Sequence, residues 1–278
     1  MVITSATNLV QELASFRERK TIGFVPTMGA LHEGHLSLVR QAKAGSDVVV
    51  VSIFVNPTQF NNPEDLKNYP REPEADIKKL KLAGADIIFT PTEKEIYPEP
   101  DTRIFDFGAM DKVMEGFYRP GHFNGVAQVV KRLFRLVQPQ LAFFGEKDFQ
   151  QLAIIKALTA QEQLPLHIVA CPTVREPDGL AMSSRNLLLS ATQRAHAPLI
   201  YKTLQEAFGK VNSTTVPALK KWVQTTIDAN PVLETEYAEI VDAHSLQPIT
   251  EWNEADSIQL CIAVYAHPIR LIDNIKLK

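Results

Sequence analysis

The stretch KTIGFVPTMGALHEGH, residues 20–35, decides how the first half of the chain is predicted to fold. An apolar run leads directly into a glycine-containing turn, and a segment with apolar residues at helical spacing follows. Four later runs have the same nearly continuous apolar character: residues 46–56, 84–91, 140–146 and 166–174. Such runs are typical of strands buried on both faces of a parallel sheet, and helical segments separate them. We therefore predict an α/β fold with a doubly wound, Rossmann-like parallel sheet.

The pattern of polar and apolar residues changes after about residue 176. A polar segment is followed by helical patterns and then by two strand candidates, residues 235–244 and 257–277. This order predicts a smaller C-terminal α+β domain. We expect a Rossmann-like domain at residues 1–175 and the smaller domain at residues 176–278.

Composition excludes several classes of protein. The 278 residues are 45% hydrophobic and 22% charged, with a formal net charge of -3, so no global basic field favours nucleic acid or an anionic membrane. The N-terminus lacks the uninterrupted apolar core of a signal peptide, and no apolar run has the length of a membrane span. Cys171 and Cys261 lie in apolar runs, which indicates buried thiols in a reducing compartment. We expect a cytoplasmic, soluble protein.

Two histidines three residues apart, His32 and His35, can be metal ligands, an acid/base pair, phosphate ligands or ordinary turn residues. Zinc-protease helices space their histidines four apart, and no third ligand cluster is evident here. The strand, turn and helix context favours phosphate, because free N–H groups at a helix start attract anions and histidine can donate to phosphate oxygens.

Polar residues follow two other predicted strands at the same edge of the sheet, where ligands of such folds bind. FVNPTQF carries the carboxamides of Asn56 and Gln59, which suit a hydroxyl or a carboxylate, although an Asn-Pro turn with incidental polarity would give the same pattern. GEKDFQQ offers Lys147 as a phosphate contact, and Asp148 can cap a helix or position a ribose or a metal.

Two further motifs carry charge. RPGHFNGV supplies Arg119 and His122 for a carboxylate or phosphate contact. AMSSRN, residues 181–186, places two hydroxyls beside Arg185 and predicts a phosphate clamp. An ordinary helix cap is the competing interpretation for one of its serines.

The motif PTMGALHEGH resembles the HIGH signature of the class I nucleotidyltransferase superfamily, and AMSSRN resembles the KMSKS loop of that superfamily. The set FVPTMGALHEGH, FVNPTQF, RPGHFNGV, FFGEKDFQQL and VREPDGLAMSSRN, in this order, resembles the pantoate–β-alanine ligase family over nearly the whole chain. The resemblance implies a homodimeric, ATP-dependent ligase. It would condense (R)-pantoate with β-alanine through a pantoyl adenylate, releasing pyrophosphate and AMP.

The resemblance also implies a set of site residues. The ATP site would comprise Met28, Gly29, Ala30, Leu31, His32, Glu33, Gly34, His35, Gly145, Glu146, Lys147, Asp148, Val174, Met182, Ser183, Ser184 and Arg185. Catalysis would rest on His35 as proton donor, with His32, Lys147 and Arg185. Gln59 and Gln151 would bind pantoate, Gln59 would also serve β-alanine, and Asn56, Arg119 and His122 are further candidate contacts.

The sequence departs from the familiar patterns in two places. AMSSRN lacks both lysines of KMSKS, so Arg185 and Lys147 would supply the positive charge. An acidic pair that the family sometimes carries reads Glu74-Ala75-Asp76, which leaves Asp76 as the candidate protein contact to Mg²⁺, held otherwise by ATP and water.

Two alternatives stay open at this point. Another HIGH-type nucleotidyltransferase would make a dinucleotide and need no amine acceptor. A catalytically silent nucleotide-binding protein would be favoured if the histidines or Arg185 were missing, and they are present. A synthetase fragment is disfavoured because no basic RNA-binding face is evident. A clamp at the domain boundary predicts that the smaller domain acts as a lid.

Overall fold

A computed structural model describes residues 1–278, which divide into two compact units. The first unit comprises residues 1–107, 119–146 and 151–172, and the second comprises residues 108–118, 147–150 and 173–278. No helix in either unit has the length and apolar character needed to cross a bilayer.

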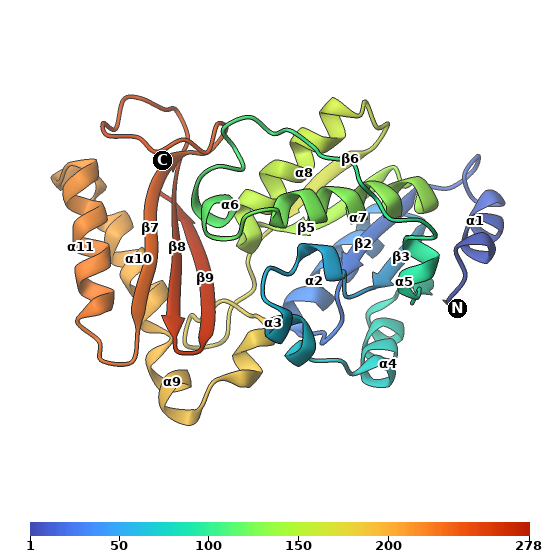
Figure 1. Ribbon diagram of the computed structural model, residues 1–278, viewed down its shortest axis with the longest axis horizontal. Coiled ribbons are helices and arrows are strands. Elements are labelled where there is room, and N and C mark those ends of the chain that lie inside the picture. Colours follow the sequence, from blue (N-terminus) through green and yellow to red (C-terminus); the bar gives the residue numbers. More distant parts are fainter. The chain divides into compact units, whose positions relative to one another are not determined.

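The first unit is built on a six-stranded parallel sheet in the order β1-β4-β3-β2-β5-β6 (Figure 1). Its strands are β1 (Val2–Ile3), β2 (Ile22–Thr27), β3 (Val48–Ile53), β4 (Ile87–Phe89), β5 (Leu141–Gly145) and β6 (His167–Cys171). Its helices are α1 (Ala6–Ala14), α2 (Glu33–Gly45), α3 (Pro63–Asn68), α4 (Pro73–Ala83), α5 (Glu93–Ile96) and α7 (His122–Val137), and α8 (Phe149–Gln161) continues into it from residues of the second unit.

Alternate residues of the strands pack on opposite faces of this sheet, because successive side chains of a strand point to opposite sides. Val25 and Phe143 join Val39 of α2 and Leu80 of α4 in one buried cluster. Phe24, next to Val25 in β2, instead meets Phe134 of α7 edge-on, with ring centroids 6.2 Å apart. The doubly wound fold predicted from the apolar runs is confirmed.

The strand order reverses between β2 and β5, which pair in parallel. On such sheets, ligands bind beyond the carboxyl ends of the strands at this switch point. The loops that follow β2, β3 and β5 are those that carry the predicted motifs, so the expectation that they share one edge is confirmed.

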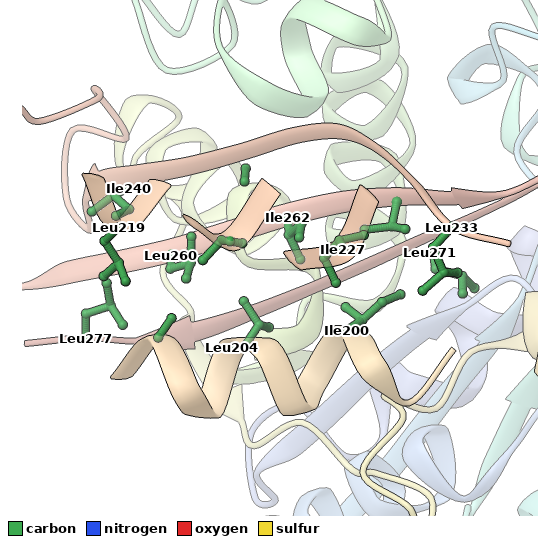
Figure 2. Close-up of a cluster of buried hydrophobic side chains, with 14 of the residues drawn as sticks. Ile200, Leu204, Leu219, Ile227, Leu233, Ile240, Leu260, Ile262, Leu271 and Leu277 are labelled. Atoms are coloured by element: carbon green, nitrogen blue, oxygen red, sulfur yellow. The ribbon is translucent and has the colours of Figure 1, made fainter. Parts of the chain in front are cut away.

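The second unit is a three-stranded antiparallel sheet, β7 (Glu234–Asp242), β8 (Ile258–Ala266) and β9 (Ile269–Lys276), with β8 in the middle. Its helices are α6 (Met114–Tyr118), α9 (Ala191–His196), α10 (Leu199–Lys210) and α11 (Val216–Asp228). Helices α10 and α11 pack against the sheet (Figure 1), and Figure 2 shows Leu204 and Ile227 among the apolar side chains between them. The predicted α+β character is confirmed.

Three elements differ from the sequence prediction. Strand β1 was missed because two residues are too short to show a period. The last strand candidate, residues 257–277, is two strands, β8 and β9, joined by a tight turn at His267 and Pro268. Residues 191–210 form two helices, α9 and α10, so three α-helices rather than the two expected lie between residue 176 and β7.

Candidate active site

The loop between β2 and α2 is held in place by α4. Both oxygens of the Asp76 carboxylate accept backbone N–H groups, from Ala30 and from Leu31, at 2.8 Å each. One turn further along α4, Lys79 Nζ donates to the carbonyl oxygen of Leu31 at 2.8 Å. Asp76 is 1% exposed, so these are charge-assisted hydrogen bonds shielded from water. The sequence patterns did not indicate this anchoring role, and a magnesium contact by Asp76 stays a prediction.

A glycine is required at the start of the same loop. Gly29 has φ +83°, a left-handed conformation that side chains disfavour. A Cβ atom there would also lie 3.1 Å from Asp76 Oδ2 and from Ile53 Cγ2. The backbone of the loop therefore lies closely against the Asp76 carboxylate.

The two histidines lie together at the start of α2. His32 is the N-cap residue, and its backbone N–H donates to His35 Nδ1 at 3.4 Å. The imidazole centroids are 4.0 Å apart. Because Nδ1 of His35 accepts, this contact favours the tautomer that carries its proton on Nε2. The three-residue spacing of His32 and His35, which favoured a phosphate site, thus places both half-buried rings at one helix N-terminus.

Gln59 is positioned by a network that surrounds it. Asn56 Nδ2 donates to Gln59 Oε1 at 3.1 Å, and His122 Nδ1 donates to the carbonyl oxygen of Gln59 at 2.8 Å. Gln59 Nε2 in turn donates to Met28 Sδ at 3.0 Å. This last contact joins the candidate pantoate glutamine to the candidate nucleotide loop within the first unit.

Asn56 makes four hydrogen bonds inside the protein. Besides Gln59 Oε1, its Nδ2 reaches the carbonyl oxygen of Gly125 at 3.1 Å. Its Oδ1 accepts from Thr58 Oγ1 at 3.1 Å and from the Tyr97 hydroxyl at 3.0 Å. Burial raises the pKa of Tyr97, which keeps its hydroxyl proton available for this bond. A direct substrate contact by Asn56 would require one of these four bonds to be exchanged.

Four other predicted site residues, Gly145, Glu146, Gln151 and Arg119, also belong to the first unit. Gly145 ends β5 and Glu146 follows it, while Gln151 is half-buried in α8. Arg119 is half-buried, and its carbonyl oxygen accepts the N–H of His122 at 3.0 Å at the start of α7.

The second unit contains the remaining predicted residues, in two segments. Residues 174–182 form a short hairpin in which the N–H of Met182 donates to the carbonyl oxygen of Val174 at 3.0 Å, and Arg175 pairs with Ala181. Ser183 Oγ then accepts the N–H of Arg185 at 3.3 Å, so this serine is a cap, while Ser184 is buried. Lys147 and Asp148 occupy the second segment, with Lys147 Nζ 3.6 Å from Asp148 Oδ1.

Strand β9, for which the sequence suggested no functional role, connects these two segments. Asp273 of β9 binds the guanidinium of Arg175 through both oxygens, at 2.6 and 2.9 Å. Its neighbour Asn274 donates from Nδ2 to the carbonyl oxygen of Lys147 at 2.9 Å. No local signal marked this role, because β9 also carries the charged residues Arg270 and Lys276.

Comparison with known proteins decides the family. The sequence matches the family described as pantoate-beta-alanine ligase over residues 1–276. The chain belongs to the pantoate–β-alanine ligase family. It is 53% identical over 274 residues to a pantothenate synthetase of Porphyromonas gingivalis, covering 97% of this chain and 98% of that protein.

Solved structures agree with this assignment. The chain superposes on pantothenate synthetase from Thermus thermophilus with a TM-score of 0.93 and 41% identity, covering 99% of both chains. It also matches a pantoate-beta-alanine ligase from Francisella tularensis, complexed with beta-gamma ATP and beta-alanine. That match has a TM-score of 0.84 and 36% identity, and covers 100% of this chain and 97% of the other. The resemblance read from the five motifs is confirmed.

Proposed function

We propose that this protein is an ATP-dependent ligase that joins (R)-pantoate to β-alanine, giving pantothenate, AMP and pyrophosphate. The observation that carries the proposal is the family match over residues 1–276. The contact between Gln59 Nε2 and Met28 Sδ supports it, because it brings an amide suited to an acid substrate against the predicted nucleotide loop.

The reaction has two steps. An oxygen of the pantoate carboxylate attacks the α-phosphorus of ATP, the bond to the β-phosphate breaks, and pyrophosphate leaves. The neutral amine of β-alanine then attacks the acyl carbon of the pantoyl adenylate, AMP leaves with the electron pair, and the amine loses a proton. No protein nucleophile is needed, since the substrate itself carries the activated acyl group.

Positioning and charge stabilisation would supply most of the catalysis. His32 and His35, at the N-terminus of α2, would donate to phosphate oxygens, and His35 is the residue to which we assign the proton donor. Lys147 and Arg185 would neutralise charge on the triphosphate, and the Ser184 hydroxyl would donate a hydrogen bond to a phosphate oxygen. Ser183 Oγ already accepts the N–H of Arg185, and its hydroxyl proton would remain to donate to a phosphate oxygen.

Gln59 and Gln151 would bind pantoate, and Gln59 would also contact β-alanine. The hydrogen bonds from Asn56 and His122 hold Gln59 in one orientation before substrate arrives. Such preorganisation lowers the entropy lost on binding. His122 therefore serves the site at least through the main chain of Gln59.

Magnesium would enter with ATP and neutralise phosphate charge. No group of three or more His, Cys, Asp or Glu side chains is arranged to hold a metal, and both Asp76 oxygens are engaged by the loop. The residues present therefore fit an ion held by phosphate oxygens and water.

We further propose that the protein is a cytoplasmic homodimer, that its sequence divides near residue 175, and that its smaller C-terminal domain acts as a lid on the nucleotide. These proposals rest on the family resemblance and on the position of the Met182 to Arg185 segment. Equilibrium sedimentation tests the dimer, and nucleotide-dependent protection of residues 182–185 in hydrogen exchange tests the lid.

One experiment tests the reaction. The protein is mixed with MgATP and pantoate, pyrophosphate release is followed, and β-alanine is then added. We expect a single turnover of pyrophosphate before the addition, and steady formation of AMP and pantothenate after it. Turnover that does not depend on β-alanine would contradict the proposal, and a dinucleotide product would favour another nucleotidyltransferase.

A further inference from the structure

We infer that Asp273 and Asn274 of β9 are positioning residues for the nucleotide, each holding one of the two phosphate-binding segments of the second unit. The inference rests on the proposed nucleotide role of Lys147 and of residues 182–185. Neither Asp273 nor Asn274 is assigned any contact with substrate.

Asp273 and Asn274 are consecutive residues of β9. Consecutive residues of a strand point to opposite faces of the sheet. Asp273 pairs with Ile262 and Asn274 with Cys261, both in β8, so both positions are fixed by the central strand of the sheet. One dipeptide can therefore reach two segments that lie on different faces.

Asp273 acts on the first segment through Arg175. The two planar groups pair through two hydrogen bonds, and the Asp273 side chain is 3% exposed. The Arg175 guanidinium carbon also lies 3.5 Å from the ring centroid of Tyr201 on α10, and Nη1 donates to the carbonyl oxygen of Gly179 at 3.2 Å. A guanidinium with partners on three sides has one orientation.

Arg175 lies within the hairpin that leads into the clamp. It is bridged to Ala181, and the flanking pair Val174 and Met182 is hydrogen-bonded. The side chain of Asn186 donates to the carbonyl oxygen of Ala181 at 3.1 Å, which ties the turn after Ser183 back to the same hairpin. Fixing Arg175 on β9 therefore fixes the backbone from which Ser184 and Arg185 project.

Asn274 acts on the second segment through the main chain of Lys147. Gln259 Nε2 donates to Asn274 Oδ1 at 2.6 Å, which turns the Asn274 amide so that Nδ2 faces the Lys147 carbonyl oxygen at 2.9 Å. Gln259 and Asn274 are 6% and 7% exposed. A buried chain of amides thus sets where the Lys147 side chain starts.

Asn274→Ala and Asp273→Asn test the inference, with ATP affinity measured by calorimetry without pantoate and with KM values for ATP and β-alanine. We expect each variant to weaken ATP binding on the order of tenfold, as loss of one or two buried hydrogen bonds predicts. The β-alanine KM should stay within about twofold of wild type, because it does not depend on these segments.

A double-mutant cycle separates positioning from a general structural role. If Asn274 acts through Lys147, then Asn274→Ala should change ATP affinity less than about twofold in a Lys147→Ala background. Asp273→Asn should likewise add little to Arg175→Gln. Equal losses in both backgrounds, or an unchanged ATP affinity, would overturn the inference.

The matched control is Glu234→Gln, which removes the exposed Glu234–His267 contact at the far end of the same sheet. It should leave ATP affinity unchanged, and a loss as large as that of Asn274→Ala would count against the inference. If Asn274→Ala does not fold, Asn274→Ser and Asp273→Asn carry the test. ATP binding by a wild-type protein that forms no pantothenate would refute the proposed function and still leave this inference measurable.

Discussion

The carboxylate of Asp76 lies 2.8 Å from the backbone nitrogen of Leu31, 45 residues earlier in the chain. Its other oxygen accepts the N–H of Ala30, so one buried side chain satisfies two consecutive donors of the histidine loop. Buried N–H groups need partners, and the loop has no sheet neighbour to supply them. The geometry of His32 and His35 thus depends on a helix that contains neither.

Asp76→Asn should destabilise this loop. The amide keeps one acceptor oxygen and turns an NH₂ group toward the other N–H donor, so we expect a loss of about 2–3 kcal/mol in unfolding free energy. Hydrogen exchange over residues 28–36 measures the local loss of protection. Urea unfolding, monitored by far-UV circular dichroism, measures the loss of unfolding free energy. Glu74→Gln, an exposed change on the same helix, is the control, and equal protection in both variants would contradict the prediction.

Much of the first unit could be predicted because its signals are local. The runs around Phe24, Val50 and Phe143 are apolar on both faces, which only a sheet covered on both sides explains. The loops that follow β2, β3 and β5 then fall on one edge by topology alone.

The supporting residues could not be predicted because their partners are far away in sequence. Asp273 meets Arg175 across 98 residues and Asn274 meets Lys147 across 127. No local period relates such pairs, and an isolated aspartate in a strand is indistinguishable from an exposed one by sequence. The turn at His267 and Pro268 was missed for a different reason, since the apolar runs on its two sides merge into one.

His35→Ala should lower the rate of pyrophosphate release on the order of a hundredfold or more, because it removes the side chain at the start of α2 that we propose as the donor to phosphate. The fold should persist, because His35 is half-buried in the first turn of α2. The control is His244→Ala, a histidine in a turn of the second unit, away from the predicted motifs. Activity within about threefold of wild type for His35→Ala would remove it from the mechanism.

Gly125→Ala should damage pantoate binding although the residue lies in a helix. Alanine normally stabilises a helix by up to about 1 kcal/mol over glycine. Here an added Cβ would lie 2.4 Å from the carbonyl oxygen of Thr58 and 2.8 Å from the nitrogen of Gln59. Since both neighbours are backbone atoms, the segment that carries Gln59 must move.

We expect the pantoate KM of Gly125→Ala to rise on the order of tenfold and the thermal midpoint to fall, as for an overpacked site. Gly209→Ala in α10 is the matched control, because a Cβ there meets nothing within 4 Å. That change should be neutral or stabilising by about 0.5–1 kcal/mol. A pantoate KM for Gly125→Ala equal to that of Gly209→Ala would show that the contact with Thr58 does not constrain Gln59.

The two free thiols, Cys171 and Cys261, should be unreactive in the folded protein. Both are buried. Burial raises the pKa of Cys171 to about 11, with the nearby charge of Glu146 acting in the same direction. Burial also raises the pKa of Cys261, and Glu115, Asp273 and Glu239 add to the effect. At about pH 7.5 we expect no reaction with a disulfide reagent until guanidinium unfolds the chain, when both thiols should react.

The raised pKa of Cys171 also predicts how the unfolding free energy depends on pH. Below the unfolded pKa of about 8.5, Cys171 is protonated in both states and stability does not change with pH through this group. Above it, the unfolded chain releases the proton while the folded chain holds it to about pH 11, so unfolding becomes progressively easier. Cys171→Ala removes this contribution, and its unfolding free energy should fall less between about pH 8.5 and 10.5 than that of wild type. Parallel curves for the two proteins would mean that the Cys171 pKa is not raised.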